Sequence, residues 1–226
     1  MFKLSSHAGS RHLFIEILMI VIGINIALWF EGWFQQLQDA EIEARYLADL
    51  RDDLLVDIGK LESAIAAASA KLEGAGRITE HLPTMAELPP DELADAIFTP
   101  ATYQFFEPSD FTYRSMQESG DFRLLRNADI KKGILKLDRH HKNIATLQLN
   151  HLQAVDDGYI PLVMTSFDIA TMRVTDPKLF ENQLFRNFFS YVQQDTYAML
   201  ELYKLVKSES ELLVTQIDNQ LELTGA

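Results

Sequence analysis

The stretch Leu13-Phe-Ile-Glu-Ile-Leu-Met-Ile-Val-Ile-Gly-Ile-Asn-Ile-Ala-Leu-Trp-Phe30 is apolar except for one carboxyl and one amide group. A helix of this length reaches about 27 Å, close to the thickness of the hydrocarbon core of a bilayer. Its apolar residues cover every face of the helix, which suits lipid better than the one-sided core of a globular domain. The stretch therefore predicts a transmembrane helix over residues 13–33.

A cleaved signal peptide is the main alternative for this segment. Such peptides end in a pair of small residues around one intervening position, and Ala27-Leu-Trp29 matches that pattern poorly. Trp29, Phe30 and Trp33 instead cluster at the C-terminal end of the apolar stretch, where membrane-interface aromatics gather. These aromatics favour a span that is retained in the mature protein.

The basic residues that flank the span predict its orientation. Lys3 and Arg11 precede it, whereas Arg45 is the only basic residue in the first stretch after Trp33. Because basic residues concentrate on the cytoplasmic side, residues 1–12 are expected to form a cytoplasmic arm and residues 34–226 an extracytoplasmic domain.

Two faces of the predicted span carry residues suited to helix contacts. Gly23 and Ala27 form a small-xxx-small pair that allows close helix approach, and Glu16 lies on the same face. Asn25 lies on the opposite face, where its amide can hydrogen-bond a neighbouring helix. We therefore expect Glu16, Gly23, Asn25 and Ala27 to be helix-docking positions. A carboxyl at headgroup depth is the plainer interpretation of Glu16.

The charge of the chain excludes several classes of partner and chemistry. The 226 residues carry a net charge of −13, all of it after the neutral N-terminal segment. An acidic domain repels phosphate backbones, so nucleic acid is not an expected partner. The chain has no cysteine, which excludes thiolate catalysis and cysteine-based metal sites.

The pattern after the span predicts helices. Apolar residues recur every three or four positions between Leu47 and Leu72, and glycine and proline are scarce. The same periodicity marks two later seams: Ile130, Ile134, Leu137, His141, Ile144 and Val155, then Phe188, Val192, Met199, Leu202, Val206, Leu213, Ile217 and Leu221. We predict an all-α fold, in which the transmembrane helix continues into an antiparallel helical bundle.

Capping and breaking residues predict where these helices begin and end. The first helix is expected to end at Gly74-Ala-Gly76, and a short one to cover residues 91–97. Ser109 is the expected cap of a helix that stops at Gly120, and Asn127 that of a long one. Gly158 and Pro161 should interrupt the chain, and Thr175-Asp176-Pro177 should start the last helix.

The acidic and histidine residues of the domain were weighed as metal ligands. Asp138 and His141 share a helix face, as in di-metal bundles, but such sites use this step twice and here it occurs once. The acids Asp49, Asp52, Asp53 and Asp57 have no glycine-centred loop to organise them. We interpret both sets as structural, and no cofactor, catalytic or nucleotide-binding motif is recognisable.

Three motifs carry a resemblance to a known family. They are the apolar stretch Phe14–Leu28 followed by Trp33, Tyr46-Leu-Ala-Asp-Leu-Arg-Asp-Asp-Leu54, and Thr112-Tyr-Arg-Ser-Met-Gln-Glu-Ser-Gly-Asp-Phe-Arg-Leu-Leu125. Together they resemble a bacterial family of single-span membrane proteins catalogued only as a domain of unknown function. The resemblance implies an inner-membrane anchor with a helical periplasmic domain, and it implies no activity. Trp29-Phe30 departs from the family, which usually has a polar residue there.

These observations favour a non-enzymatic role. We expect an accessory or scaffold subunit that packs through its span against a respiratory, photosynthetic or transport assembly, with the lipid bilayer and other transmembrane helices as partners and no cofactor. The alternative is a self-associating, membrane-anchored sensor or ligand-binding module, which predicts a pocket between helices. A metal-dependent enzyme built on Asp138 and His141 is the least favoured interpretation.

Overall fold

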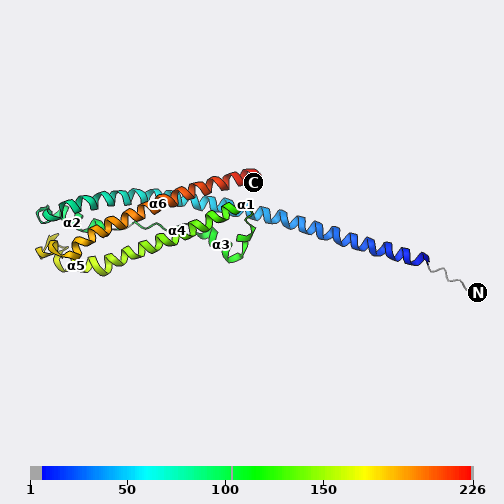
Figure 1. The fold of residues 1–226 in the computed structure, drawn as a ribbon, viewed down its shortest axis with the longest axis horizontal. Coiled ribbons are helices and arrows are strands. Elements are labelled where there is room, and N and C mark those ends of the chain that lie inside the picture. Colours follow the sequence, from blue (N-terminus) through cyan, green and yellow to red (C-terminus); the bar gives the residue numbers. More distant parts are fainter. Residues whose placement is uncertain (1–6, 103, 225–226) are drawn as a thin grey trace, which may run out of the picture.

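One helix, α1, runs without a break from His7 to His81. The computed structural model describes residues 7–102 and 104–224. Figure 1 shows the first part of α1 projecting from a bundle that its second part helps to build. The continuous helix confirms the expectation that the apolar stretch extends past Trp33 into a helical domain.

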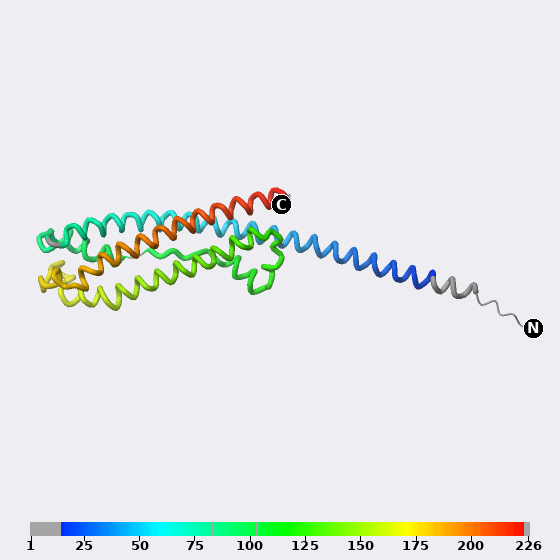
Figure 2. Tube along the Cα trace, in the orientation of Figure 1, coloured from blue at the N-terminus to red at the C-terminus, as the bar shows by residue number. Residues whose placement is uncertain are grey.

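Two further long helices complete the bundle. They are α4 (Ala128–Gln153) and α6 (Gln183–Thr224). The helix α6 packs antiparallel to the second part of α1 and also against α4 (Figures 1 and 2). The three long amphipathic helices expected from the sequence are therefore present, and the all-α prediction is confirmed.

The helix α1 ends later than the sequence predicts. Glycine in a helix interior costs about 1 kcal/mol relative to alanine, which made Gly74 and Gly76 a plausible stop. Packing outweighs that cost, because Ala75 between them is buried and a Cβ on Gly76 would lie 3.4 Å from Gln193 Nε2 of α6. The close approach of α6 keeps α1 helical as far as His81.

The half of the bundle nearest the projecting part of α1 has its own hydrophobic core. The short helices α3 (Phe111–Ser119) and η3 (Asp121–Leu124) close this half beside the three long helices. The predicted seams point into the core, which contains the buried side chains of Leu47, Leu50, Leu54, Leu61, Ile130, Ile134, Leu137, Ile144, Met199, Val206, Leu213 and Ile217.

A second core fills the distal end, where the chain makes its short turns. Its elements are η1 (Leu82–Glu87), α2 (Pro90–Phe98), η2 (Thr99–Ala101), the π-helical turn η4 (Ala154–Tyr159), α5 (Ile160–Ser166) and η5 (Pro177–Glu181). Tyr159 stacks on Phe188 with ring centroids 3.8 Å apart and donates its hydroxyl to the Ile97 carbonyl. Strands β1 (Phe167–Asp168) and β2 (Arg173–Val174) pair as a minimal antiparallel hairpin.

Two of the predicted helix boundaries are confirmed. Gly120 ends α3 in the left-handed conformation, with a φ of 79°, which glycine adopts at no steric cost. Asn127 caps α4, because its Oδ1 accepts the backbone N–H groups of Asp129 and Ile130. Both signals are local and need no tertiary contact to act.

Three other boundaries were predicted wrongly. Ser109 does not cap α3, whose N-cap residue is Asp110 without a side-chain cap bond; the Ser109 N–H donates to Asp57 of α1. Asp176 caps only the 3-10 turn η5, and α6 begins after Asn182, whose Oδ1 accepts the N–H of Leu184. The chain also stays helical past Gly158, because the π-helical turn η4 joins α4 directly to α5.

Candidate functional site

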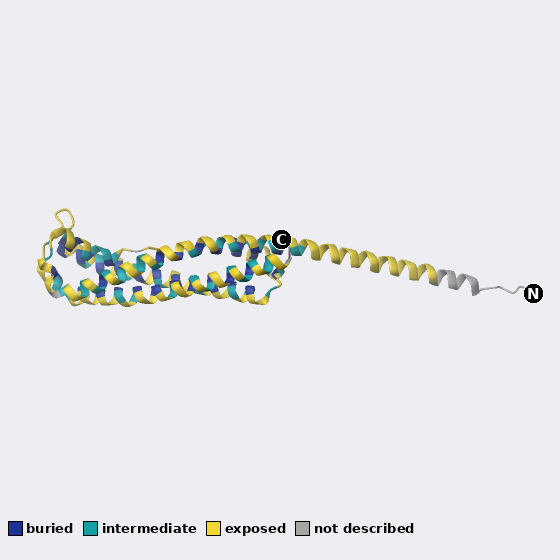
Figure 3. Cartoon of the chain, turned by 90° about the horizontal axis from the view of Figure 1, so that it is seen from above, coloured by how far each residue is buried: buried dark blue, intermediate teal, exposed yellow. Residues whose placement is uncertain are grey.

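The projecting part of α1 is exposed from residue 15 onward. Every residue from 15 to 38 is exposed, and Figure 3 shows burial confined to the bundle. The segment is long and apolar enough to cross a membrane. Trp29, Phe30 and Trp33 contact one another edge to face, with centroids 5.5 and 6.3 Å apart. This geometry gives the segment a continuous aromatic patch near its junction with the bundle.

The four docking positions lie on this exposed helix. A Cβ built on Gly23 would meet no atom within 4 Å, and Glu16 and Ala27 are exposed as well. Asn25 donates its amide to the Val21 carbonyl of its own helix at 2.7 Å, so part of its hydrogen-bonding capacity is used internally. Its Oδ1 keeps its acceptor capacity for a neighbour.

An ion pair with a buried carboxylate connects the projecting segment to the bundle. Glu43 is 6 % exposed, and its Oε1 accepts the backbone N–H of Arg126 at 2.6 Å. The Arg126 guanidinium lies 3.4 Å from Glu43 Oε2 and donates to the Gln36 carbonyl at 3.2 Å. Arg126, which precedes α4, therefore contacts α1 at two levels, at Gln36 and at Glu43, where α1 enters the bundle.

A chain of three polar side chains crosses the middle of the bundle. Lys71 Nζ of α1 lies 3.3 Å from His151 Nε2 of α4, and His151 Nδ1 lies 2.9 Å from Asp195 Oδ2 of α6. Lys71 also donates to the Thr102 carbonyl at 2.7 Å. Burial lowers the pKa of Lys71 to about 8, although the nearby Asp195 carboxylate acts to raise it. The chain links all three long helices at one level.

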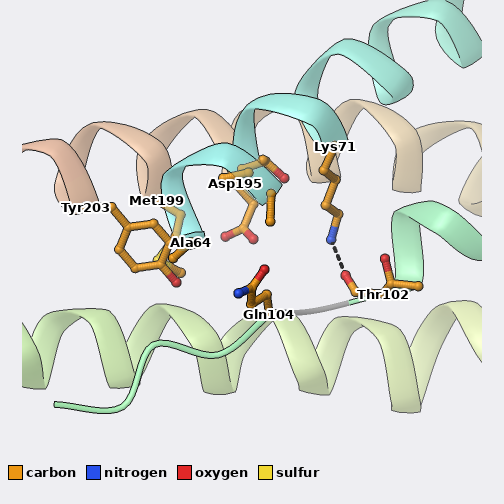
Figure 4. A pocket seen from close by; sticks show the side chains of 10 residues that line it. Ala64, Lys71, Thr102, Gln104, Asp195, Met199 and Tyr203 are labelled. Atoms are coloured by element: carbon orange, nitrogen blue, oxygen red, sulfur yellow. Dashed lines mark hydrogen bonds between the residues drawn. The ribbon is translucent and has the colours of Figure 1, made fainter. Parts of the chain in front are cut away.

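A cavity of about 220 Å³ lies beside this polar chain. In Figure 4, Asp195 and Gln104 point toward each other across it, and Lys71 reaches toward the Thr102 carbonyl. The cavity exists because short side chains of α1 face α6 here: Ala64, Ala67 and Ala68. Sequence reasoning missed this site, although His151 and Asp195 occupy positions on the otherwise apolar seams of α4 and α6.

The two acidic sets considered as metal ligands meet at a second cavity, of about 230 Å³. Asp53 and Asp57 of α1 line it together with Asp138 and His141 of α4, whereas Asp49 and Asp52 do not. Asp138 is held by Lys142 at 2.7 Å. Within residues 7–102 and 104–224, no three His, Asp or Glu side chains are grouped so as to hold a metal ion.

No protein-family model matches the chain, and no curated protein or solved structure shows detectable similarity to it. Three features of the chain bear on its function: the exposed apolar helix, the Glu43–Arg126 junction and the two cavities between the helices.

Proposed function

We propose that this protein is a membrane-anchored, non-enzymatic accessory subunit that packs against a larger membrane assembly through its N-terminal span. The observation that carries the proposal is the continuity of α1, whose exposed apolar part and buried bundle part are one helix. A flexible linker would merely tether the domain. A continuous helix transmits the orientation of the span to the bundle.

The dimensions of α1 fit a rigid spacer. From Trp33 to the first partly buried residues near Asp39 the helix rises about 9 Å, so the bundle stands close to the membrane surface. From there to His81 it rises about 60 Å further, which holds the distal core far from the bilayer. Such a subunit offers one contact surface within the membrane and another well outside it.

The resemblance and the flanking charges give the proposal its topology. Residues 1–12 lie in the cytoplasm, residues 13–33 span the bacterial inner membrane, and residues 34–226 are periplasmic. Glu16, Gly23 and Ala27 form one helix-docking face and Asn25 the other, while Trp29, Phe30 and Trp33 lie at the outer interface.

Purification of the full-length chain from its native membrane in mild detergent tests the docking role. Gly23→Leu and Ala27→Leu should each release the co-purifying partner, because bulk on this face blocks close helix approach. Ile17→Leu, at a helix position between the two docking faces, is the matched control and should retain the partner. Recovery of the wild-type chain as a monomer, or loss of partner from the control alone, would overturn the proposal.

A ligand-binding module is the second candidate function, and the cavity lined by Asp53 and His141 favours it. Its lining is mostly apolar, which is typical of small-molecule sites in helical bundles. This role is compatible with membrane anchoring. It differs from the first in predicting that a small molecule, rather than a protein partner, changes the stability of the bundle.

A further inference from the structure

The cavity at Asp53 lies between α1 and α4 and is roofed by the segment before α3. Its apolar walls come from three helices, and the residues that form them are Leu50, Leu54, Ile134, Leu137 and Leu213. Pro108, Ser109 and Tyr113 lie on the roof side. A cavity of about 230 Å³ with such walls suits the apolar body of a small organic molecule.

The segment that covers the cavity is hydrogen-bonded to α1 through Asp53 and Asp57, two of the acids that line the cavity. Asp57 Oδ1 accepts the N–H of Ser109 at 2.8 Å, and Asp53 Oδ2 accepts that of Thr112 at 3.3 Å. Lys60 adds a hydrogen bond to Ser109 Oγ at 2.9 Å. These bonds hold the carboxylates in place, and each carboxylate retains acceptor capacity for a further donor.

One carboxylate of the lining has no basic partner. Asp57 lies 3.4 Å from the ammonium of Lys60, Asp110 pairs with Arg114, and Asp138 lies 2.7 Å from the ammonium of Lys142. Within the described residues, no basic side chain pairs with Asp53, the fourth carboxylate. The half-buried His141 adds no compensating charge at neutral pH, since burial lowers its pKa. An apolar cavity with such a lining attracts organic cations and repels organic anions.

One polar atom of the lining lacks a partner. His141 Nε2 is buried and has no hydrogen bond from any residue in 7–102 or 104–224. A buried polar group left in this state costs about 1–3 kcal/mol. Phe106 packs on the same ring at 5.6 Å and restricts its movement.

We propose that this cavity binds a small organic amine, whose apolar body lies among the leucines and whose ammonium faces the carboxylates of Asp53 and Asp138. The ammonium provides three donors, and carboxylate oxygens are its acceptors. Tyr113, which also lines the cavity, presents an aromatic ring that favours a cation. The inference does not depend on the docking role of the span.

Three ligands with one apolar body and different head groups test this assignment. They are 2-phenylethylamine, 2-phenylethanol and 3-phenylpropionate, titrated calorimetrically into the full-length chain in uncharged nanodiscs, with empty nanodiscs as the blank. The amine should bind at least about tenfold more tightly than the alcohol, an advantage of the size that charge-assisted hydrogen bonds provide. The carboxylate should not bind.

Charge-removing variants then locate the site. Asp53→Asn with Asp138→Asn keeps one acceptor oxygen and the side-chain shape at each position, so the fold persists while the tenfold preference for the amine disappears. Asp49→Asn, on the same helix but outside the cavity, is the control and should keep the preference. Equal affinity for amine and alcohol in the wild type, unchanged amine affinity in the double variant, or no binding at millimolar concentrations would each overturn the proposal.

Discussion

Glu43 of α1 and the backbone of Arg126 meet at 2.6 Å, 83 positions apart in the chain, at the level where the projecting helix enters the bundle. The carboxylate is almost fully buried, yet its partner's guanidinium is more than half exposed. Removal of one partner from such a pair is costly, because it leaves the other group buried without compensation. The Glu43–Arg126 pair connects the projecting helix to the bundle.

Replacement of Glu43 by alanine should destabilise the bundle by about 1–3 kcal/mol, because the Arg126 N–H loses its acceptor in a partly buried position. Glu43→Gln keeps an oxygen there and should lose about half as much. Thermal unfolding of the full-length protein in detergent, followed by circular dichroism, measures both. Wild-type stability in Glu43→Ala would show that the junction is held by other contacts.

Gly120→Ala should destabilise the protein by about 1 kcal/mol, since alanine resists the left-handed conformation that ends α3. Gly120→Asn should cost less, because asparagine tolerates that conformation better. Gly74→Ala is the matched control: a Cβ there meets no atom within 4 Å, so the change should be neutral or stabilising. Urea unfolding compares the three, and an unaffected Gly120→Ala variant would contradict the assignment.

Lys71 should make stability rise with pH above about 8. Its pKa is about 8 in the folded protein and 10.5 when exposed, so between these values the unfolded chain binds the extra proton. From pH 7.5 to 9.5 its contribution to the free energy of unfolding should increase by about 2 kcal/mol. The increase is complete only at pH values above 10.5, the pKa of Lys71 in the unfolded chain.

Urea unfolding of wild type and Lys71→Met at both pH values isolates this contribution, which the variant lacks. Lys204→Met removes an exposed lysine of α6 and controls for the change in net charge. Lys71→Gln serves the same purpose if the methionine variant does not fold. Parallel pH profiles for wild type and the Lys71 variants would mean that the buried amine does not titrate in this range.

The features that the sequence predicts well are those encoded within a few turns of helix. The seam residues from Leu47 to Leu61 and from Ile130 to Ile144 follow from periodicity, which is local. The cap at Asn127 and the stop at Gly120 are local as well. The end of α1 was missed because the packing of α6 on Ala75, a tertiary contact, decides it.

The candidate sites depend on contacts that no local pattern contains. Lys71 and His151 are 80 positions apart, and His151 and Asp195 are 44. Polar residues at seam positions, such as His151 and Asp195, could have indicated a site in the core. They do not predict which helices bring these residues together. Asp53 and His141 were singled out separately. The fold places them at one cavity, where the apolar lining shifts the chemistry from metal ions toward organic cations.

The proposed topology predicts opposite accessibility for the two ends of the chain. Because the protein has no cysteine, a single introduced thiol gives an unambiguous label. Leu223, near the end of α6, is 85 % exposed, and Leu223→Cys should react with a membrane-impermeant maleimide in intact spheroplasts. Ser5→Cys, in the arm before the span, should react only after detergent is added. Labelling of Ser5→Cys but not Leu223→Cys in intact spheroplasts would reverse the orientation, and labelling of both would show that the apolar helix does not cross the membrane.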